Sequence, residues 1–407
     1  MKALVLCGGY PQMALLKELK LRGIETVLAD ANSAVVARPY ADKFYQVSVL
    51  DVEAVKDVAI KEQVDFLITV CADQVLLVVA QISETLGLPC YIDYATADKV
   101  SKKSLMKKIF AENGVPTSKY VVMESFDAEM IKGLEYPLIV KPVDAYSSRG
   151  VCRVDDPKCL KEAFERAADI SRTKNAIVEE FVEGNELTVD VYVEQGTAHV
   201  LSIANLDKIG EDGKFVIHRA KNPADISAQT RERIAYAAQR IADAFGLKNT
   251  PMLIQLIDKG EDISVVEFCA RTGGGDKYRI IKVVSGFDVV KAVVDLTLGK
   301  FPHVEKNTKK QDYIIDEFLY CKEGVFDRLE GFDELVNENI MEMYCQLKPK
   351  GYKFKEINSS GDRVAYFSIQ AKTAEEAWKK HTIVNERIKV ISTEGEDILR
   401  HDVIAKR

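Results

Sequence analysis

The sequence predicts an α/β domain at the amino end, an α+β region in the middle and a smaller α+β unit at the carboxyl end. Short apolar strands alternate with helical patterns up to about residue 95, as in a parallel sheet. After Asn113-Gly114-Val115-Pro116 this alternation gives way to strands separated by turns. Gly299-Lys300-Phe301-Pro302 then precedes a third group of strands and helices. A chain of 407 residues is long enough for several such units.

The first 95 residues open with a strand, a helix and a second strand. The apolar run Ala3–Cys7 stops at Gly8-Gly9, a helical pattern covers Met13–Lys20, and the strand Glu25–Ala29 ends at Asp30. The same patterns predict a helix over 51–58, a buried strand over 66–70 and a helix over 75–86 that Gly87 ends.

The middle region combines an apolar-faced helix, Lys102–Glu112, with several strands and a long amphipathic helix, Gln229–Phe245. The turn Lys259–Asp262 predicts a hairpin. Strands are predicted over 138–142, 176–181, 187–193, 252–257 and 263–268. In the third unit they are predicted over 313–319, 340–347 and 363–371, with helices over 332–337 and 373–386.

Composition and charge argue against several classes of protein. The net charge of −7 gives no overall basic field, so we expect neither a nucleic-acid nor a membrane partner. The eight cysteines form no CxxC pair, and no apolar run approaches ~20 residues, so we expect reduced thiols in a cytoplasmic protein. The five histidines form no HExxH motif and no GxSxG is present, which argues against zinc hydrolases and enzymes with a serine nucleophile elbow.

Two stretches carry groups suited to a nucleotide. A strand delivers Lys141 to a loop containing Ser147, Ser148, Arg149 and Gly150, which are donor-rich or small residues of the kind that fold over phosphates. A surface loop with a snorkelling lysine explains this pattern equally well. The stretch from Glu179 to Glu186 offers backbone groups for a purine and a carboxylate for ribose hydroxyls; a charged hairpin is the alternative.

A third stretch carries oxygen ligands. Gln255 lies twelve residues before Glu267, so on antiparallel strands joined by a short hairpin the two side chains can face each other and ligate Mg²⁺. Arg271 follows on the same side of the strand and is placed to steady phosphate charge. A salt bridge between Glu267 and Arg271 is the alternative.

Taken in order along about three quarters of the chain, these motifs resemble the ATP-grasp superfamily, most closely its carbamoyl-phosphate-synthase-like and L-amino-acid-ligase-like members. The resemblance implies a Rossmann-like pre-ATP-grasp domain over 1–95. It also implies a two-lobed ATP-grasp domain over 96–300, with a small lobe at about 105–180 and a larger lobe at about 181–300. A closing α+β domain would follow over 301–407.

The resemblance also implies roles for individual residues. Lys141 and Arg271 would be catalytic, with Arg271 stabilising the transferred phosphoryl group, and Gln255 and Glu267 would bind Mg²⁺ or Mn²⁺. Lys102 and Lys107 are close enough to Lys103 that either could take its place. The ATP-binding set implied is Lys103, Lys141, Ser147, Ser148, Arg149, Gly150, Glu179, Glu180, Phe181, Val182 and Glu186.

The chain departs from the family pattern at Cys269. Many members have Asn two residues after the metal-binding Glu, and a thiol is a poor ligand for Mg²⁺. We therefore expect water or another oxygen to complete the shell of the second metal. The departure leaves a non-catalytic ATP-binding protein as one alternative.

The activity implied is ATP-dependent activation of a small carboxylate or amino acid as an acyl phosphate, which an amine or a thiol then attacks. The chemistry needs positioning and charge neutralisation rather than a side-chain nucleophile. Candidates for holding the substrates are Asp276, Lys277, Arg279 and Arg219.

Other activities and assemblies remain open. Activation of bicarbonate, as in carbamoyl-phosphate synthesis or biotin carboxylation, is an alternative. A dinucleotide-binding oxidoreductase is disfavoured because Cys7–Pro11 lacks GxGxxG. A homodimer is expected from base rates alone.

Overall fold

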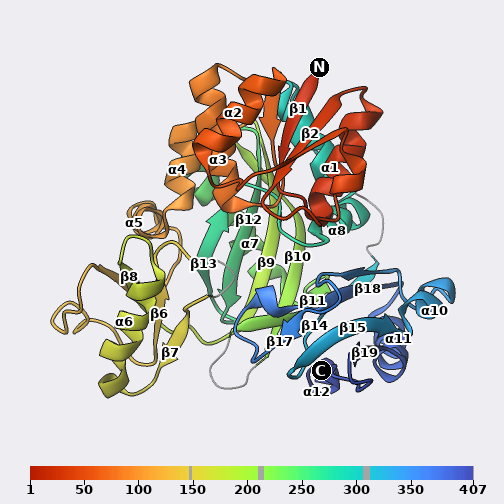
Figure 1. Ribbon diagram of the computed structural model, residues 1–407. Helices are drawn as coiled ribbons and strands as arrows, with labels where there is room; N and C mark the ends of the chain where they lie inside the picture. The colour runs from red at the N-terminus through yellow and green to blue at the C-terminus, as the bar shows by residue number, and fades with distance from the viewer. Residues whose placement is uncertain (146–148, 210–214, 306–311, 407) are drawn as a thin grey trace.

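The computed structural model describes residues 1–145, 149–209, 215–305 and 312–406 (Figure 1). Its amino-terminal unit is a parallel sheet of order β3-β2-β1-β4, as the strand and helix alternation predicts. Side chains of the helices pack on both faces of this sheet, forming two separate apolar clusters. The elements are β1 Lys2–Leu6, α1 Tyr10–Leu21, β2 Glu25–Asp30, β3 Lys43–Gln46, α2 Val52–Glu62, β4 Phe66–Ile68 and α3 Asp73–Leu86.

Glycine is required where β1 ends. A Cβ on Gly8 would lie 2.2 Å from Cγ2 of Val35, so only glycine allows this close approach. The Gly8 amide donates to the Asp30 carboxylate at 2.8 Å, and Pro11 occupies the first turn of α1. Asp30 therefore supports the turn itself.

The small lobe is a second, separate sheet of four antiparallel strands in the order β5-β8-β6-β7 (Figure 1, yellow). Helix α6 packs Ala163, Phe164 and Ala167 against Leu138 and Val140 of this sheet, because these residues repeat at helical spacing. The elements from the first unit through this lobe are α4 Tyr94–Ser101, α5 Lys103–Glu112, β5 Tyr120–Met123, β6 Leu138–Pro142, β7 Cys152–Val154, α6 Leu160–Ile170 and β8 Ala176–Glu180.

The large lobe is built on an eight-stranded sheet of order β13-β12-β9-β10-β11-β14-β18-β16. Helix α7 buries Ile234, Ala238 and Ile241 in the same core as Val189 and Ile254 of this sheet. Helix α9 packs against α1, so the first unit rests on the large lobe. The elements of the lobe are β9 Asn185–Glu194, β10 Thr197–Ile209, β11 Val216–Asn222, α7 Ala228–Phe245, β12 Thr250–Asp258, β13 Ile263–Cys269, α8 Lys277–Ser285 and α9 Val289–Thr297.

The last hundred residues share that sheet. Strand β14 pairs with β11, placing Glu317 opposite Arg219, so the boundary that the sequence places at residue 300 falls between neighbouring strands of one sheet. Strands β17-β15-β19 form a smaller sheet beside it. The elements are β14 Tyr313–Leu319, β15 Gly324–Glu330, α10 Phe332–Asn337, β16 Met343–Gln346, β17 Lys353–Phe354, β18 Ala365–Ala371, α11 Ala374–Arg387, β19 Lys389–Ser392 and α12 His401–Ile404.

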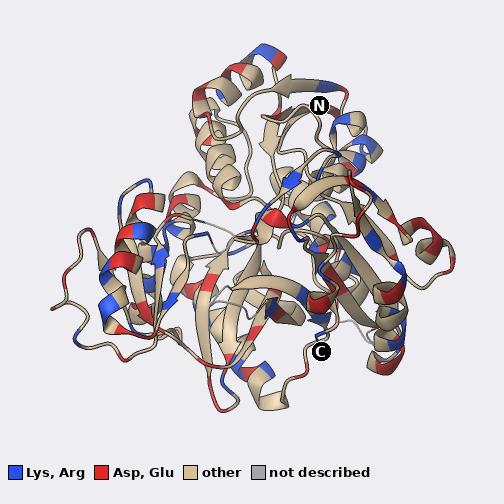
Figure 2. Cartoon of the chain, turned by 60° about the horizontal axis from the view of Figure 1, so that its bottom comes forward, with Lys and Arg blue, Asp and Glu red and all other residues tan. Residues whose placement is uncertain are grey.

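Charged residues of both signs are interspersed through all parts of the fold (Figure 2). Among the residues that the structure describes, no helix combines the length and the apolar character needed to cross a membrane.

Candidate active site

A cleft lies between the small lobe and the large sheet and is open to solvent. Strands β6 and β8 line it from one side and β9, β12 and β13 from the other, while Lys103 enters from the start of α5. The residues predicted for ATP or metal that line it are Lys103, Lys141, Glu179, Glu180, Phe181, Val182, Glu186, Gln255 and Glu267.

Glu179 organises the lysines at the small-lobe side of the cleft. Its carboxylate, 6% exposed, pairs with Lys141 and, at 2.8 Å, with Lys107. Burial alone would raise the pKa of Glu179, but the two ammonium groups outweigh burial and hold the pKa at about 2. Glu179 is therefore an ionised anchor for Lys141, which lines the cleft.

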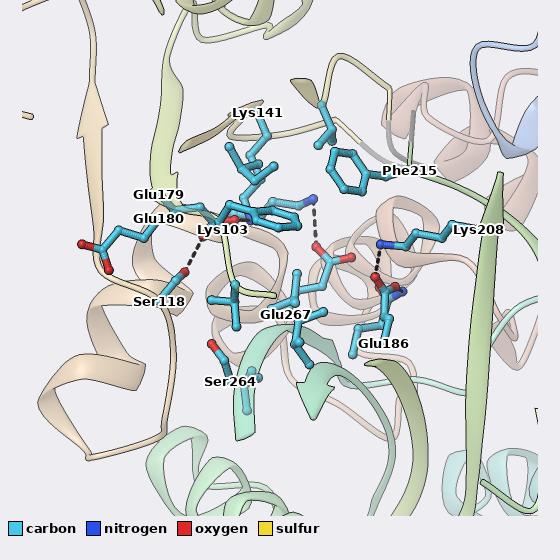
Figure 3. A pocket seen from close by; sticks show the side chains of 18 of the residues that line it. Lys103, Ser118, Lys141, Glu179, Glu180, Glu186, Lys208, Phe215, Ser264 and Glu267 are labelled. Atoms are coloured by element: carbon cyan, nitrogen blue, oxygen red, sulfur yellow. Dashed lines mark hydrogen bonds and ion pairs between the residues drawn. The ribbon is translucent and has the colours of Figure 1, made fainter. Parts of the chain in front are cut away.

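The structure separates Lys103 from Lys107, which the sequence leaves as alternatives. The ammonium group of Lys107 is bound by Thr117 at 2.6 Å, Ser118 at 3.1 Å and Glu179, and Lys107 is not among the residues lining the cleft. Lys103 lines the cleft and pairs with Glu267 at 2.9 Å (Figure 3). Of the two lysines, Lys103 is thus the one that lines the cleft.

Gln255 and Glu267 face each other across the β12–β13 hairpin, because the strand register makes them direct partners. Burial would raise the pKa of Glu267, but Lys103 lowers it, so the carboxylate is ionised. These two oxygen donors fit Mg²⁺, which takes one or two protein oxygens and completes its shell with water and phosphate. The described residues contain no group of three or more His, Cys, Asp or Glu side chains arranged for a metal.

The sequence analysis missed Lys208 and Phe215, which line the cleft from β10 and the start of β11. Lys208 forms an ion pair with Glu186, as Figure 3 shows, and its ammonium group lies 4.8 Å from the centre of the Phe215 ring. Phe215 lies 6.2 Å from Phe181, ring centre to ring centre. No motif marks either residue; only the pairing of β10 with β9 brings Lys208 to Glu186.

The loop after β6 is described in part. Ser147 and Ser148 lie outside the described residues, Arg149 is exposed, and neither Arg149 nor Gly150 is among the residues lining the cleft. A Cβ on Gly150, whose φ is +76°, would lie 2.7 Å from Cδ1 of Ile170 and 2.9 Å from Cγ of Pro142. A side chain at this position would therefore collide with Pro142, so the chain needs glycine here.

Arg271 lies just beyond the cleft lining and pairs with Asp73 at the start of α3, at 2.6 and 2.5 Å. Burial would lower the pKa of Arg271, but Asp73 raises it well above its usual value. The bidentate pair with Asp73, and not one with Glu267, fixes the guanidinium. Burial and the neighbouring Asp73 raise the pKa of the Cys269 thiol, so it stays protonated.

The four substrate candidates separate into two places. Lys277 pairs with Asp190 at 2.8 Å, and Arg279 pairs with Asp276 at 2.5 Å, all around the start of α8. Arg219 lies elsewhere, on β11 opposite Glu317 of β14. It is fully buried, pairs with Glu317 at 2.5 Å and donates to the Ile404 carbonyl at 2.6 Å. This placement corrects the expectation for Arg219: it joins the carboxyl end of the chain to the sheet and is closed to a substrate.

Parts of the chain match known proteins in sequence. The family model for the ATP-grasp domain matches residues 134–279. The alanine–anticapsin ligase of Bacillus subtilis is 26% identical over 253 residues, which are 55% of this chain and 53% of that protein. In two further curated relatives, a multifunctional protein of Schizosaccharomyces pombe and a formate-dependent phosphoribosylglycinamide formyltransferase of Ignicoccus hospitalis, the aligned region spans 14% and 63% of the relative.

Solved structures show the same fold over almost the whole chain. The L-amino acid ligase of Bacillus licheniformis aligns with a TM-score of 0.83 at 21% identity, covering 96% of this chain and 98% of that one. The biotin carboxylase domain dimer of Hydrogenobacter thermophilus 2-oxoglutarate carboxylase, in complex with MgADP, ADP and bicarbonate, aligns with a TM-score of 0.77 at 16% identity over 99% and 92% of the two chains. The chain therefore contains an ATP-grasp domain over residues 134–279, and it shares its fold with solved ligases and carboxylases.

Proposed function

We propose that the chain is an ATP-dependent ligase that phosphorylates a small carboxylate, such as an amino acid, and joins the acyl group to an amine or a thiol. The observation that carries the proposal is the convergence of Lys103, Lys141, Gln255 and Glu267 on one cleft between the two lobes. This set combines cations for phosphate oxygens with oxygen donors for a divalent metal, which is what phosphoryl transfer requires.

In this proposal each side of the cleft has a different task. Phe181, Val182 and Glu180 hold the adenine, and Glu186 meets the ribose. Lys141 and Lys103 hold phosphate oxygens, and the loop with Ser147, Ser148, Arg149 and Gly150 covers them. The last set is supported only by its place in the chain, directly after β6.

Transfer of the phosphoryl group takes place at the far end of the cleft. Gln255 and Glu267 hold Mg²⁺ or Mn²⁺, which when bound neutralises charge on the triphosphate. Arg271, fixed by Asp73, stabilises the negative charge that builds up on the transferred group. The carboxylate oxygen attacks the γ-phosphorus and ADP leaves; the nucleophile then attacks the acyl carbon and phosphate leaves.

The test is release of ADP and phosphate from Mg-ATP with pools of amino acids and small carboxylic acids, with bicarbonate as a separate member, followed by mass analysis of the products. Substrate-dependent ADP together with a new amide or thioester mass supports the ligase. Turnover with bicarbonate alone would support a carboxylase. ATP binding without any turnover would support a non-catalytic ATP-binding protein.

Two variants test the site assignment. Lys141→Ala and Glu267→Ala should each abolish turnover, because each removes a charge from the phosphate or metal site. The matched controls are Lys132→Ala and Glu261→Ala, which remove the same charges from exposed positions on the small lobe and in the β12–β13 turn. Full activity of both cleft variants would refute the assignment.

We also propose a homodimer, which the dimeric Hydrogenobacter structure supports by analogy. Sedimentation velocity on the full chain tests it, since a monomer at all concentrations contradicts the proposal.

A further inference from the structure

A second group of polar side chains lies where the three parts of the chain meet, outside the ATP cleft. Asp276 precedes α8, Asp316 is on β14 and Tyr366 is on β18; each is at most 4% exposed. We call these three residues the junction cluster. Tyr10, at the start of α1, lies beside it, with its ring centre 6.4 Å from that of Tyr366.

The polar atoms of the junction cluster are buried without partners. One carboxylate oxygen of Asp276, one of Asp316 and the hydroxyl of Tyr366 have no hydrogen-bond partner within the described parts of the chain. Buried polar groups in native proteins are paired with protein, water or a ligand. Three orphaned atoms in one place therefore indicate a site that a polar molecule fills.

The same atoms carry uncompensated negative charge. Three carboxylates buried to 4% exposure or less, Asp190, Asp276 and Asp316, share two cations: Lys277 pairs with Asp190 and Arg279 with Asp276. Arg279 also donates to Ser368 at 2.5 Å, so its guanidinium is engaged on both sides. Burial, followed by the charge of Asp276, raises the pKa of Asp316 to about 7, as expected for a carboxylate that lacks its own cation.

The site is connected to the reaction centre by the chain itself. Only four residues, Thr272 and Gly273–Gly275, separate Asp276 from Arg271. The Thr272 hydroxyl and the second oxygen of Asp190 are also buried without a partner in the described residues. A Cβ on Gly273 would lie 3.2 Å from that Asp190 oxygen and 2.2 Å from Cδ of Lys277. The buried atoms without hydrogen-bond partners thus extend from the loop after β13 to strands β14 and β18.

We propose that the junction cluster binds a primary ammonium group of the amine substrate, between the free oxygens of Asp276 and Asp316 and the Tyr366 hydroxyl. An ammonium group supplies three donors and one positive charge, which matches three unpaired acceptors and one uncompensated carboxylate. This inference rests on the proposed ligase function and specifies which class of nucleophile that ligase takes.

The experiment uses hydroxylamine, which is uncharged near neutral pH and traps an acyl phosphate as a hydroxamate without needing an ammonium site. Each acid of the panel is incubated with Mg-ATP, hydroxylamine and a competing amine: ethylamine, L-alanine or 1,4-diaminobutane. In the wild-type chain at least one amine should lower the hydroxamate yield. In Asp316→Asn the amine concentration that halves the yield should rise about tenfold or more, while the KM for ATP stays within about twofold.

A second variant guards against misfolding, and a third is the matched control. Tyr366→Phe removes one unpartnered hydroxyl, so it should keep the thermal midpoint of the wild type while weakening amine competition. Asp312→Asn makes the same substitution four residues from Asp316, where the carboxylate is already bound by Lys372 at 2.8 Å and Gln370 at 2.7 Å. In this variant the amine should compete with hydroxylamine as it does in the wild type.

The outcomes separate the two proposals. Hydroxamate formation with no competition from any amine, or with equal competition in wild type and Asp316→Asn, overturns the ammonium site and leaves the ligase standing. If no acid yields hydroxamate in the wild-type chain, the ligase itself fails, and the ammonium site falls with it.

Discussion

Replacing Lys107 by Met tests whether this lysine is structural, as its burial indicates. At neutral pH the fall in the pKa of Glu179 from an ordinary 4.5 to about 2 corresponds to about 3 kcal/mol of stability, the balance of the two lysines against burial; burial also lowers the pKa of Lys107, which offsets part of this. Met fills nearly the same volume but leaves Lys141 as the remaining cation on Glu179. We therefore expect a loss of roughly 2 kcal/mol, somewhat below the range for leaving a buried charge fully unpaired.

The pH dependence of this loss has a definite sign. A carboxyl whose pKa is lowered on folding stabilises the protein above its unfolded pKa, and this stabilisation is lost as pH falls through the folded value. The difference between wild type and Lys107→Met should therefore be full at pH 7 and shrink between about pH 4.5 and 2. Urea unfolding followed by circular dichroism measures it.

Two companion variants make the test specific. Lys108→Met alters the next residue. Lys108 is exposed and forms a surface ion pair with Glu112 at 3.8 Å, which contributes little, so the free energy of unfolding should not change. Lys103→Met should weaken ATP binding in titration calorimetry. If Lys107→Met is as stable as wild type but no longer binds ATP, then Lys107 is the phosphate ligand and our assignment is wrong.

Two further predictions concern residues that the motifs do not mark. Lys208→Met should raise the Kd for ATP about tenfold in calorimetry, because it removes a cation from the cleft. Lys221→Met, on the next strand, should leave the Kd unchanged. If both variants bind ATP with the same affinity, Lys208 does not belong to the site. For Asp316 the folded pKa of about 7 exceeds the ordinary 3.8, so the free protein should lose thermal stability as pH rises from about 4 to 7. Asp316→Asn should flatten that slope, and an unchanged slope would show that Asp316 does not cause it.

Much of the fold was predictable because local patterns decide it. The strands Leu138–Pro142 and Tyr313–Leu319 and the helix Phe332–Asn337 form over the residues that their apolar patterns predict. Strands β10 and β11 were not predicted as elements, although they form the centre of the largest sheet. Pairing between distant strands, which places β14 beside β11, leaves no periodic mark in the sequence.

The candidate site was also predictable only in part. Gln255 and Glu267 were predicted to face each other, and the register confirms that they do, although a register shift next to Gln255, and not the hairpin turn alone, brings the two residues opposite each other. The partner of Arg271 could not be predicted, because Asp73 lies 198 residues away in another unit. Arg219 was offered as a substrate residue because arginine suits carboxylates, but only the fold shows that Glu317 already occupies it.

The sharing of one sheet by the large lobe and the last hundred residues has a consequence for dissecting the protein. A fragment ending near residue 300 would strip β14 from β11 and leave the β11 edge with free N–H and C=O groups along four paired positions. Exposed edges of this kind recruit other strands and promote aggregation. It would also leave Arg219 as a buried charge without Glu317. Deletion variants that keep the cleft intact therefore need the carboxyl-terminal strands as well.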